Sequence, residues 1–245
     1  CLASLVQEAT SFPHEIIVVD NASSDGTAEE LNSWKSHFLG KWDFVNLIAN
    51  KDNRGFGAAC NQGSAMAKGQ VLLFLNPDTQ IQPGALAGLA DFFEKHPKAG
   101  VVGGKILNSD GTVQCSVRRF PKLLDQFLIL FGVQKMVPHL APLRRYSMSD
   151  FDYTHEAQVD QAMGAFFAVR RELFEKLHGF DERFFLWFEE VDFCKRAKQA
   201  GFEVWYTPRA SVIHQGAASF RQRGRLRLRL IWLKSLGRYF KKHGF

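Results

Sequence analysis

Acidic side chains follow two of the most apolar stretches of this sequence. Asn76-Pro77-Asp78 comes directly after residues 71–75, and Glu189-Glu190-Val191-Asp192 follows residues 184–188. A histidine, His214, ends a third short apolar run. Carboxylates and imidazoles at the ends of buried elements are costly to place unless they bind a cation or transfer a proton. These residues therefore predict a metal-dependent site of the kind used by a transferase.

The elements that must position these residues alternate between strand and helix in the first half of the chain. Apolar runs typical of buried strands lie at residues 15–19, 44–48, 71–75 and 99–103, with helical patterns at 27–35, 53–68 and 83–96. This alternation predicts an α/β fold with a mostly parallel sheet flanked by helices. Ligands of such sheets bind beyond the carboxyl ends of the strands, where Asp20 and Asp78 are expected.

The second half of the chain has a different pattern. Two short apolar runs around Asn108-Ser109-Asp110-Gly111 predict a hairpin, and residues 120–157, with three prolines, predict loop and short helix. Further strands are expected at 166–169 and 203–206, and a helix at 191–199. Because no repeat or low-complexity linker interrupts the chain, we expect one domain over residues 1–245. Its nucleotide-binding half would span residues 1–104 and its acceptor and catalytic half residues 105–220.

Composition is that of an ordinary soluble globular protein, with 46% apolar and 23% charged residues in a length of 245. The four cysteines form no CxxC pair, which argues against a zinc site or a disulfide framework and fits the cytoplasm. No apolar stretch is long enough to span a bilayer. The start, Cys1-Leu2-Ala3-Ser4-Leu5, has neither an initiator Met nor the basic region of a signal peptide, so we expect it to lie inside a longer protein.

The net charge of +6 is unevenly distributed. Ten Lys and Arg and no acid lie from Arg209 onward, whereas residues 1–208 carry 21 bases and 25 acids. The acidic body argues against nucleic acid as a partner. Residues 221–245 are expected to form a basic amphipathic helix, with Leu226 and Leu230 on its apolar stripe. This helix would either pack on the domain or contact anionic lipid at the inner face of the plasma membrane.

Several motifs, taken in order, resemble those of family 2 inverting glycosyltransferases, and most closely their rhamnosyltransferase-like branch. The motifs are residues 20–27 (DNASSDGT), 53–63 (NRGFGAACNQG), 75–79 (LNPDT), 164–165 (GA), 170–172 (RRE), 179–182 (GFDE), 188–192 (FEEVD) and His214. The resemblance covers nearly the whole chain. It implies the GT-A fold, a nucleotide-diphosphate-sugar donor and Mg²⁺ or Mn²⁺. It also implies that an N-terminal central strand precedes residue 1, and we expect folding or activity to be impaired without that strand.

The resemblance implies roles for the donor and metal residues. Asp20 corresponds to the residue that reads the base, and Asp78 to the metal-binding member of an Asp-x-Asp motif in which Asn76 replaces the first acid. His214 corresponds to a late metal ligand. As alternatives, Asp20 caps a turn and Asp78 fills a type I turn after Pro77. The implied donor-binding residues are Asp20, Asn21, Arg54, Gly55, Asn76, Asp78 and Gly164, where Arg54 either binds phosphate or is a solvated charge.

The catalytic base is expected in the acidic block. An inverting transfer needs one carboxylate to take the proton of the acceptor hydroxyl, and Glu190 is our choice. Because the family carries Glu-Asp where this chain has Glu189-Glu190, the assignment between the two stays open, and Glu189 is also an acceptor-binding candidate. Asp192 falls on another helical face and would orient the site. Trp187 is interpreted equally well as a platform for a sugar ring or as a core aromatic.

Together these features predict transfer of rhamnose or a similar sugar from a dTDP- or UDP-linked donor during synthesis of bacterial surface polysaccharide. The acceptor would be a saccharide or a sugar on polyprenyl diphosphate. Two alternatives remain open at this point. One is a nucleotidyltransferase of the same fold, and the other is a catalytically inactive sugar-binding or scaffolding module, which the acid-to-Asn76 change would favour.

Overall fold

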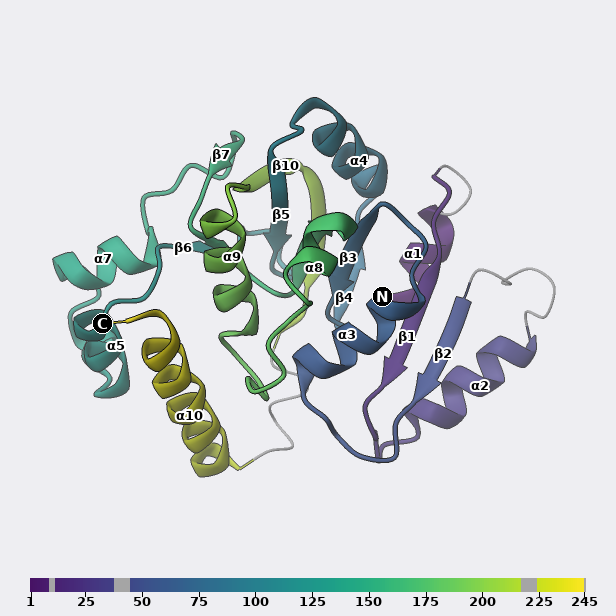
Figure 1. Ribbon diagram of the computed structural model, residues 1–245, viewed down its shortest axis with the longest axis horizontal. Coiled ribbons are helices and arrows are strands. Elements are labelled where there is room, and N and C mark those ends of the chain that lie inside the picture. Colours follow the sequence, from purple (N-terminus) through teal and green to yellow (C-terminus); the bar gives the residue numbers. More distant parts are fainter. Residues whose placement is uncertain (9–11, 38–44, 217–223, 245) are drawn as a thin grey trace.

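The computed structural model describes residues 1–8, 12–37, 45–216 and 224–244 (Figure 1). After helix α1 (Leu2–Glu8), the first half follows the predicted alternation of strands and helices. Its elements are β1 (Ile16–Asp20), α2 (Thr27–His37), β2 (Val45–Ala49), α3 (Phe56–Met66), β3 (Val71–Leu75), β4 (Thr79–Ile81), α4 (Ala85–Lys95) and β5 (Ala99–Leu107).

The second half contains short helices and strands before it returns to the sheet. Its elements are β6 (Val117–Arg118), α5 (Leu123–Leu130), α6 (Val133–Met136), α7 (Ala141–Ser147), β7 (Ala157–Gln158), β8 (Gln161–Ala162), β9 (Phe166–Arg170), α8 (Arg171–Lys176), α9 (Glu189–Gln199), β10 (Glu203–His214) and α10 (Arg225–His243). Residues 120–157 thus form loops and short helices, as the three prolines indicated. The expected hairpin around Asn108 is reduced to a single bridge between Leu107 and Val113.

The central sheet is mixed, and its strand order is β3-β9-β5-β10-β4. Strand β7 also pairs with β10, antiparallel, outside this order. Strands β3, β5 and β10 run in one direction, as the alternating pattern predicts, whereas β9 lies antiparallel between β3 and β5. Strand β9 enters late in the chain, after the excursion through β6 to β8, and local pattern carries no information on where such a strand inserts. Strands β1 and β2 form a separate parallel pair.

The strand expected at residues 203–206 and the short apolar run that His214 ends, residues 210–213, form one strand, β10. Its pairing with β5 shifts register between Thr207 and Ser211. Pro208 lies in this interval, and because proline cannot donate to a ladder, a bulge is the place where a strand tolerates it. The strand therefore continues past Pro208 and delivers His214 to the far end of the sheet.

Two apolar layers cover the faces of the central sheet. One is built around Phe92 and Phe166 under α4, with α1 packed at its edge; the other is built around Phe167, Phe180 and Phe193 under α8 and α9. Helix α10 lies against α9 through a third cluster. None of the helices in the described ranges is both long and apolar enough to cross a bilayer.

Candidate active site

Asp78 and His214 meet at one edge of the central sheet. Asp78 lies in the turn between β3 and β4, and His214 ends β10, which pairs with β4. The Gln215 amide donates to the Asp78 carbonyl at 3.0 Å, and Asp78 Oδ1 lies 3.3 Å from His214 Nε2. Asn76 Nδ2 lies 3.4 Å from the same nitrogen. The structure therefore brings together the two residues assigned to the metal, with Asn76 beside them.

A chain of hydrogen bonds orients the ring of His214. Thr112 Oγ1 donates to Asp110 Oδ1 at 2.6 Å and accepts from Asn108 Nδ2 at 2.9 Å. Asn108 Oδ1 accepts from Gln114 Nε2 at 3.2 Å, and Gln114 Oε1 lies 2.8 Å from His214 Nδ1. Because an ionised carboxylate only accepts, every link has one direction. Nδ1 therefore donates to Gln114 Oε1, and this bond orients the ring so that Nε2 faces the Asp78 carboxylate.

This donor set suits a divalent cation that is shared with a diphosphate. One carboxylate oxygen and one neutral imidazole nitrogen are ligands that Mn²⁺ accepts, and Mg²⁺ or Mn²⁺ commonly completes its shell with phosphate oxygens. Across the ranges that the structure describes, no three His, Cys, Asp or Glu side chains are grouped to hold a metal by themselves. The residues present therefore fit a cation that arrives with, or is completed by, the donor.

Asp20 and Asn21 organise the loops at the end of β1. Asp20 is buried, and its carboxylate accepts the Ser23 amide at 3.3 Å, which is the turn-capping arrangement given above as an alternative. The Asn21 side chain accepts the Arg54 amide at 3.0 Å and donates to the Gly55 carbonyl at 3.1 Å. Asn21 thus ties the turn after β1 to the loop that begins α3. A direct contact of either residue with the donor stays a prediction.

Arg54 and Gly55 occupy different environments at the start of α3. Arg54 is half exposed and makes one long ion pair, 4.0 Å, with Glu182, so its guanidinium is accessible to an anion. Gly55 has φ +92°, and a Cβ built there would lie 2.6 Å from the Phe185 carbonyl oxygen. The Phe56 amide donates to that same oxygen at 3.0 Å. Gly55 therefore lets α3 approach the loop that leads into Glu189 and Glu190.

We expect Gly55→Ala to destabilise the protein by about 2 kcal/mol or more, because strain at positive φ and overlap with the Phe185 carbonyl add together. Gly26→Ala is the matched control, since Gly26 has φ +85° but nothing lies within 4 Å of the point that its Cβ would occupy. Urea unfolding of both variants separates the two causes. Equal losses for Gly26→Ala and Gly55→Ala would show that the close approach to Phe185 contributes nothing.

Gly164 lies between β8 and β9, in a segment that borders the Asp78 turn. The Asn76 amide donates to the Ala165 carbonyl at 3.2 Å, and a Cβ on Gly164 would lie 3.9 Å from the Phe56 ring. The space beside Gly164 is therefore not closed by backbone, unlike that beside Gly55.

Glu189 and Glu190 begin α9 in an unusually desolvated place. Glu189 is 4% exposed, and Oε2 of each carboxylate is buried without a hydrogen-bond partner among the described residues. Burial raises the pKa of Glu189 well above its ordinary value, with the charge of Glu190 as the second cause. Burial likewise raises the pKa of Glu190. A buried carboxylate with a raised pKa is suited to accept a proton near neutral pH.

The two carboxylates have different neighbours. Glu189 lies beside α3, close to Gly57, and its charge helps to raise the pKa of the Cys60 thiol, after burial. The positive charge of Arg118 on β6 lowers the pKa of Glu190 and so partly offsets the effect of burial on that pKa. Its charge also contributes to the raised pKa of Tyr146 on α7, for which burial is the main cause. Glu190 thus faces the elements of the second half, where an acceptor is expected.

We expect Glu189→Gln to raise the free energy of unfolding at pH 8 by about 1 to 2 kcal/mol and to change it little near pH 4. The Glu189 pKa is higher in the folded than in the unfolded protein, so its contribution to stability is complete below its ordinary value of 4.5 and is lost as pH rises through the folded pKa. Glu94→Gln, on the exposed side of α4, is the control. Urea titrations at both pH values that show no gain would contradict this placement.

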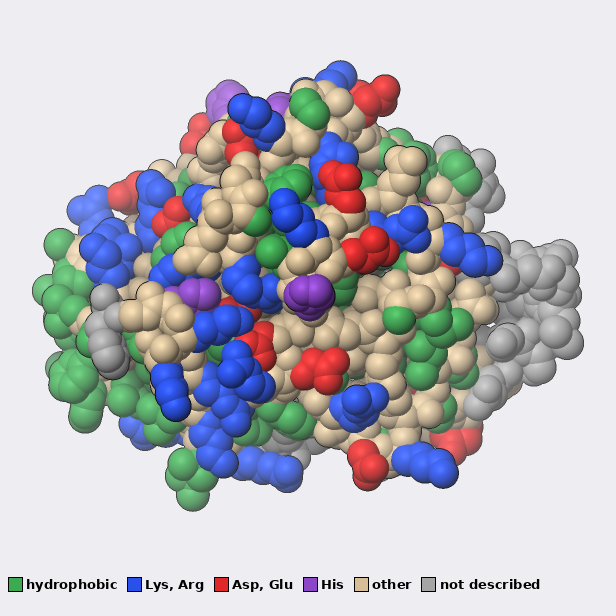
Figure 2. All heavy atoms as spheres, in the orientation of Figure 1, with side chains coloured by type: hydrophobic (Ala, Val, Ile, Leu, Met, Phe, Trp, Pro, Cys, Tyr) green, Lys and Arg blue, Asp and Glu red, His purple; other side chains and the backbone are tan. Residues whose placement is uncertain are grey.

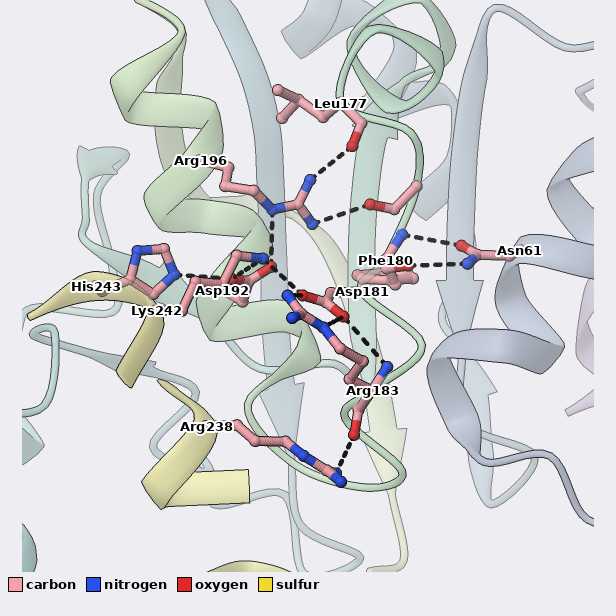
Figure 3. Close-up of polar contacts among 11 residues, drawn as sticks. Asn61, Leu177, Phe180, Asp181, Arg183, Asp192, Arg196, Arg238, Lys242 and His243 are labelled. Atoms are coloured by element: carbon pink, nitrogen blue, oxygen red, sulfur yellow. Dashed lines mark hydrogen bonds and ion pairs between the residues drawn. The ribbon is translucent and has the colours of Figure 1, made fainter. Parts of the chain in front are cut away.

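Asp192 is fully buried in an ion-pair network that joins α9 to α10 (Figure 3). Its Oδ2 accepts Arg196 Nε at 2.7 Å, and its Oδ1 lies 2.7 Å from both Lys242 Nζ and His243 Nε2. Lys242 also pairs with Asp181 at 2.7 Å. With both oxygens engaged, Asp192 is placed to hold the two helices together, and any catalytic effect would act through the position of α9.

Trp187 and Phe188 lead into α9 with φ +64° and +72°, an uncommon backbone for large side chains. Phe188 is buried in the cluster with Tyr239 and Phe240 of α10, and Trp187 packs, partly buried, against the same cluster. The Ser235 hydroxyl donates to the Leu186 carbonyl at 2.9 Å. Helix α10 therefore supports the strained turn before Glu189, and Trp187 has the surroundings of a core aromatic.

Sequence reasoning did not single out Gln114 or Arg118. Both lie in the segment between β5 and α5, whose polar residues carry no motif. The Gln114 amide donates to the Ile106 carbonyl on β5 at 2.8 Å, whereas Arg118 is held by the pairing of β6 with β8.

Comparison with known proteins agrees with this geometry. The model for "Glycosyl transferase family 2" matches residues 1–178, more than half of the chain. The chain belongs to glycosyltransferase family 2. A second model, "N-terminal domain of galactosyltransferase", matches residues 144–215. Two solved GT-A enzymes confirm the expected fold. GalNAc-T7 with UDP, GalNAc and Mn²⁺ has a TM-score of 0.62 and 17% identity, over 87% of this chain and 40% of that one. A Pyrobaculum calidifontis mannosyltransferase with GDP-Man and Mn²⁺ has a TM-score of 0.60 and 20% identity, over 97% of this chain and 59% of that one.

Among curated proteins, the Mycobacterium tuberculosis N-acetylglucosaminyl-diphospho-decaprenol L-rhamnosyltransferase is 30% identical over 231 residues, 89% of this chain and 71% of its own length. The rhamnosyltransferase WbbL of Escherichia coli is 28% identical over 151 residues, 60% of this chain and 53% of its own length. The rhamnosyltransferase-like resemblance is thereby confirmed. The chain spans 40% and 59% of the two solved structures named above, which have further segments of their own.

Proposed function

We propose that this family 2 chain is an inverting glycosyltransferase that moves rhamnose or a similar sugar from a dTDP- or UDP-linked donor to a lipid-linked acceptor. The observation that carries the proposal is the pair of desolvated carboxylates at the start of α9, each with one buried oxygen, Oε2, that has no hydrogen-bond partner among the described residues. A buried acid with an unsatisfied oxygen lowers stability and is retained where a reaction needs it. The scaffold alternative offers no reason to keep this pair.

In the proposed reaction the acceptor hydroxyl oxygen attacks the anomeric carbon while its proton passes to the Glu190 carboxylate. The bond between that carbon and the diphosphate oxygen breaks on the opposite face, which inverts the configuration. Asp78 and His214 Nε2 would hold a divalent cation, which when bound offsets charge on the leaving diphosphate. Asp20 would read the base, and Arg54, accessible beside Gly55, would contact the phosphates.

The choice of sugar and acceptor rests on the curated relatives. The mycobacterial protein is named for rhamnosyl transfer to N-acetylglucosaminyl-diphospho-decaprenol, and the E. coli protein is also named a rhamnosyltransferase. We therefore place the activity at the inner face of the plasma membrane, in surface-polysaccharide synthesis. A polyprenyl acceptor also suits the basic helix α10, on which Arg227, Arg229 and Lys234 are exposed.

The proposal is tested with dTDP-rhamnose and a panel of UDP- and GDP-sugars, Mn²⁺, and a short polyprenyl-diphospho-N-acetylglucosamine. We expect a product heavier by one deoxyhexose in mass spectrometry, with inverted anomeric configuration by NMR. Release of pyrophosphate from a nucleoside triphosphate and a sugar phosphate would instead identify a nucleotidyltransferase. Donor binding without hydrolysis or transfer, in a chain extended at both ends, would favour the scaffold.

We expect Gln114→Leu to weaken Mn²⁺ binding by about 10- to 100-fold, the usual effect of losing a residue that orients a metal-bound histidine. Without the acceptor at Nδ1, the His214 ring can rotate or change tautomer. Gln114→Glu should keep the affinity, because a carboxylate also accepts from Nδ1, and the exposed Gln199→Leu is the control. Electron paramagnetic resonance titration measures free Mn²⁺ directly. An unchanged affinity in Gln114→Leu, alongside a loss in His214→Ala, would exclude this role.

A further inference from the structure

Helix α5 has its polar residues inside and its apolar residues outside. Asp125 and Gln126 are 1% and 2% exposed, whereas Leu124 and Phe127 are each 57% exposed. An ordinary surface helix shows the opposite arrangement. The polar side chains are held in place: Asp125 accepts the Lys122 amide at 3.0 Å and pairs with the Arg145 guanidinium. The apolar exposure is therefore built into the fold by specific buried contacts.

The exposed apolar surface extends beyond α5. Phe131 is 62% exposed and its ring lies 4.5 Å from that of Phe127, and Met136 at the end of α6 is 84% exposed. On the neighbouring α10, Leu226 and Leu230 are 74% and 52% exposed. Figure 2 shows hydrophobic side chains gathered along the left edge, over α5 to α7. We call Leu123, Leu124, Phe127, Phe131, Met136, Val137, Leu226 and Leu230 the apolar face.

Cations of α10 lie beside this face. Arg229 Nη2 donates to the Leu130 carbonyl at 3.1 Å, which joins α10 to the end of α5. Arg227, Arg229 and Lys234 are exposed, and no carboxylate in the described ranges pairs with them. Figure 2 shows the resulting band of Lys and Arg over α10, next to the apolar edge. Helix α10 itself contains no acid.

We propose that the apolar face and the basic band of α10 together form a docking surface for an anionic lipid bilayer. Exposed Phe and Leu side chains insert to the depth of the head groups, and Lys and Arg beside them bind lipid phosphates. A second copy of this chain that docked through the same face would leave the unpaired cations of α10 uncompensated, because its own surface there is basic. Charge complementarity therefore favours an anionic membrane as the occupant.

Helix α5 lies between the docking surface, on its exposed side, and the proposed acceptor side of the active site, on its buried side. Gln126, on the buried side of α5, hydrogen-bonds Tyr146, whose pKa also responds to Glu190. A sugar carried on a polyprenyl chain in the bilayer would thus approach Glu190 past α5. This last step rests on the proposed function, whereas the docking itself does not.

Vesicle co-sedimentation tests the docking surface. Wild type should bind phosphatidylcholine vesicles that contain about 30% phosphatidylglycerol, an anionic lipid, because the cations of α10 attract a negative surface. It should bind vesicles of pure phosphatidylcholine far more weakly. Phe127→Ser/Phe131→Ser should weaken binding about tenfold or more, and Arg227→Glu/Arg229→Glu at least about fivefold for each charge removed. Met66→Ser and Lys98→Glu, exposed residues on α3 and before β5, are the matched controls.

Two results would overturn the proposal. One is binding by the double variants that equals that of the controls. The other is light scattering that shows a dimer of wild type without vesicles, abolished in Phe127→Ser/Phe131→Ser, which would identify a second copy as the occupant. Hydrolysis of a water-soluble nucleotide sugar without vesicles should be the same in wild type and in these variants. Its absence in wild type would count against the proposed function and leave the vesicle result standing by itself.

Discussion

Glu190→Gln should lower kcat for sugar transfer by roughly 10³-fold, within the range of a lost general base, while the affinity for the nucleotide sugar stays nearly constant. The amide keeps the size of the side chain but cannot take the acceptor proton. Steady-state kinetics with varied acceptor, and a separate titration of donor binding, distinguish the two effects. Because burial raises the pKa of Glu190 above 4.5, the acidic limb of the wild-type kcat/KM profile should lie above pH 4.5 and disappear in the variant.

Glu189→Gln is the matched control for this prediction. Glu189 faces α3 and Glu190 faces Arg118, so the two amides are isosteric changes in adjacent positions with different neighbours. We expect Glu189→Gln to keep at least about a tenth of the wild-type kcat. If it loses activity as completely as Glu190→Gln while donor binding is kept in both, the carboxylates act as a coupled pair and the assignment of the base to Glu190 alone is wrong.

The second large effect is expected at the metal. Asp78→Asn should reduce kcat/KM by roughly a hundredfold or more and weaken Mn²⁺ binding in parallel, because a neutral amide replaces the carboxylate opposite His214 Nε2. Excess Mn²⁺ should restore part of the rate. Activity at graded Mn²⁺ concentrations, beside direct metal titration, measures both. Asp91→Asn, at a partly exposed ion-pairing residue on α4, controls for loss of a negative charge.

A metal dependence that is the same in Asp78→Asn and in wild type would exclude Asp78 as a ligand. Asn76 makes a second comparison possible within the same turn. Asn76→Asp should tighten Mn²⁺ binding, since the side chain already lies 3.4 Å from His214 Nε2 and would add a carboxylate to the donor set.

Much of the fold followed from local pattern. The apolar runs at β1, β3 and β5 and the small-residue helix α3 were predicted within a few residues, because strand and helix periods act over short distances. The insertion of β9 between β3 and β5 was not predictable in this way, since it depends on pairing between residues about 70 to 100 positions apart. The same holds for β10, which has the pattern of two strands around Pro208 but pairs as one.

The candidate site divides along the same line. The acids after apolar runs were recognisable from residue type and position, and motif order predicted the family. That Asp192 binds Arg196, Lys242 and His243 was not predictable, because Lys242 and His243 belong to a helix far along the chain from α9. The polar chain through Gln114 and the inverted helix α5 were equally hidden, since each depends on side chains from different elements.

By itself, the sequence determined the class of the protein and the residue types of its chemistry, because apolar periodicity and ordered motifs are local properties of a chain. Only the tertiary structure decided which of these residues share an environment. Desolvation and hydrogen bonding depend on neighbours from distant segments: they raise the pKa values of Glu189 and Glu190, aim His214 Nε2 at Asp78, and turn the apolar side of α5 outward. The desolvation and hydrogen-bond free energies that cause these effects arise only when the segments come into contact.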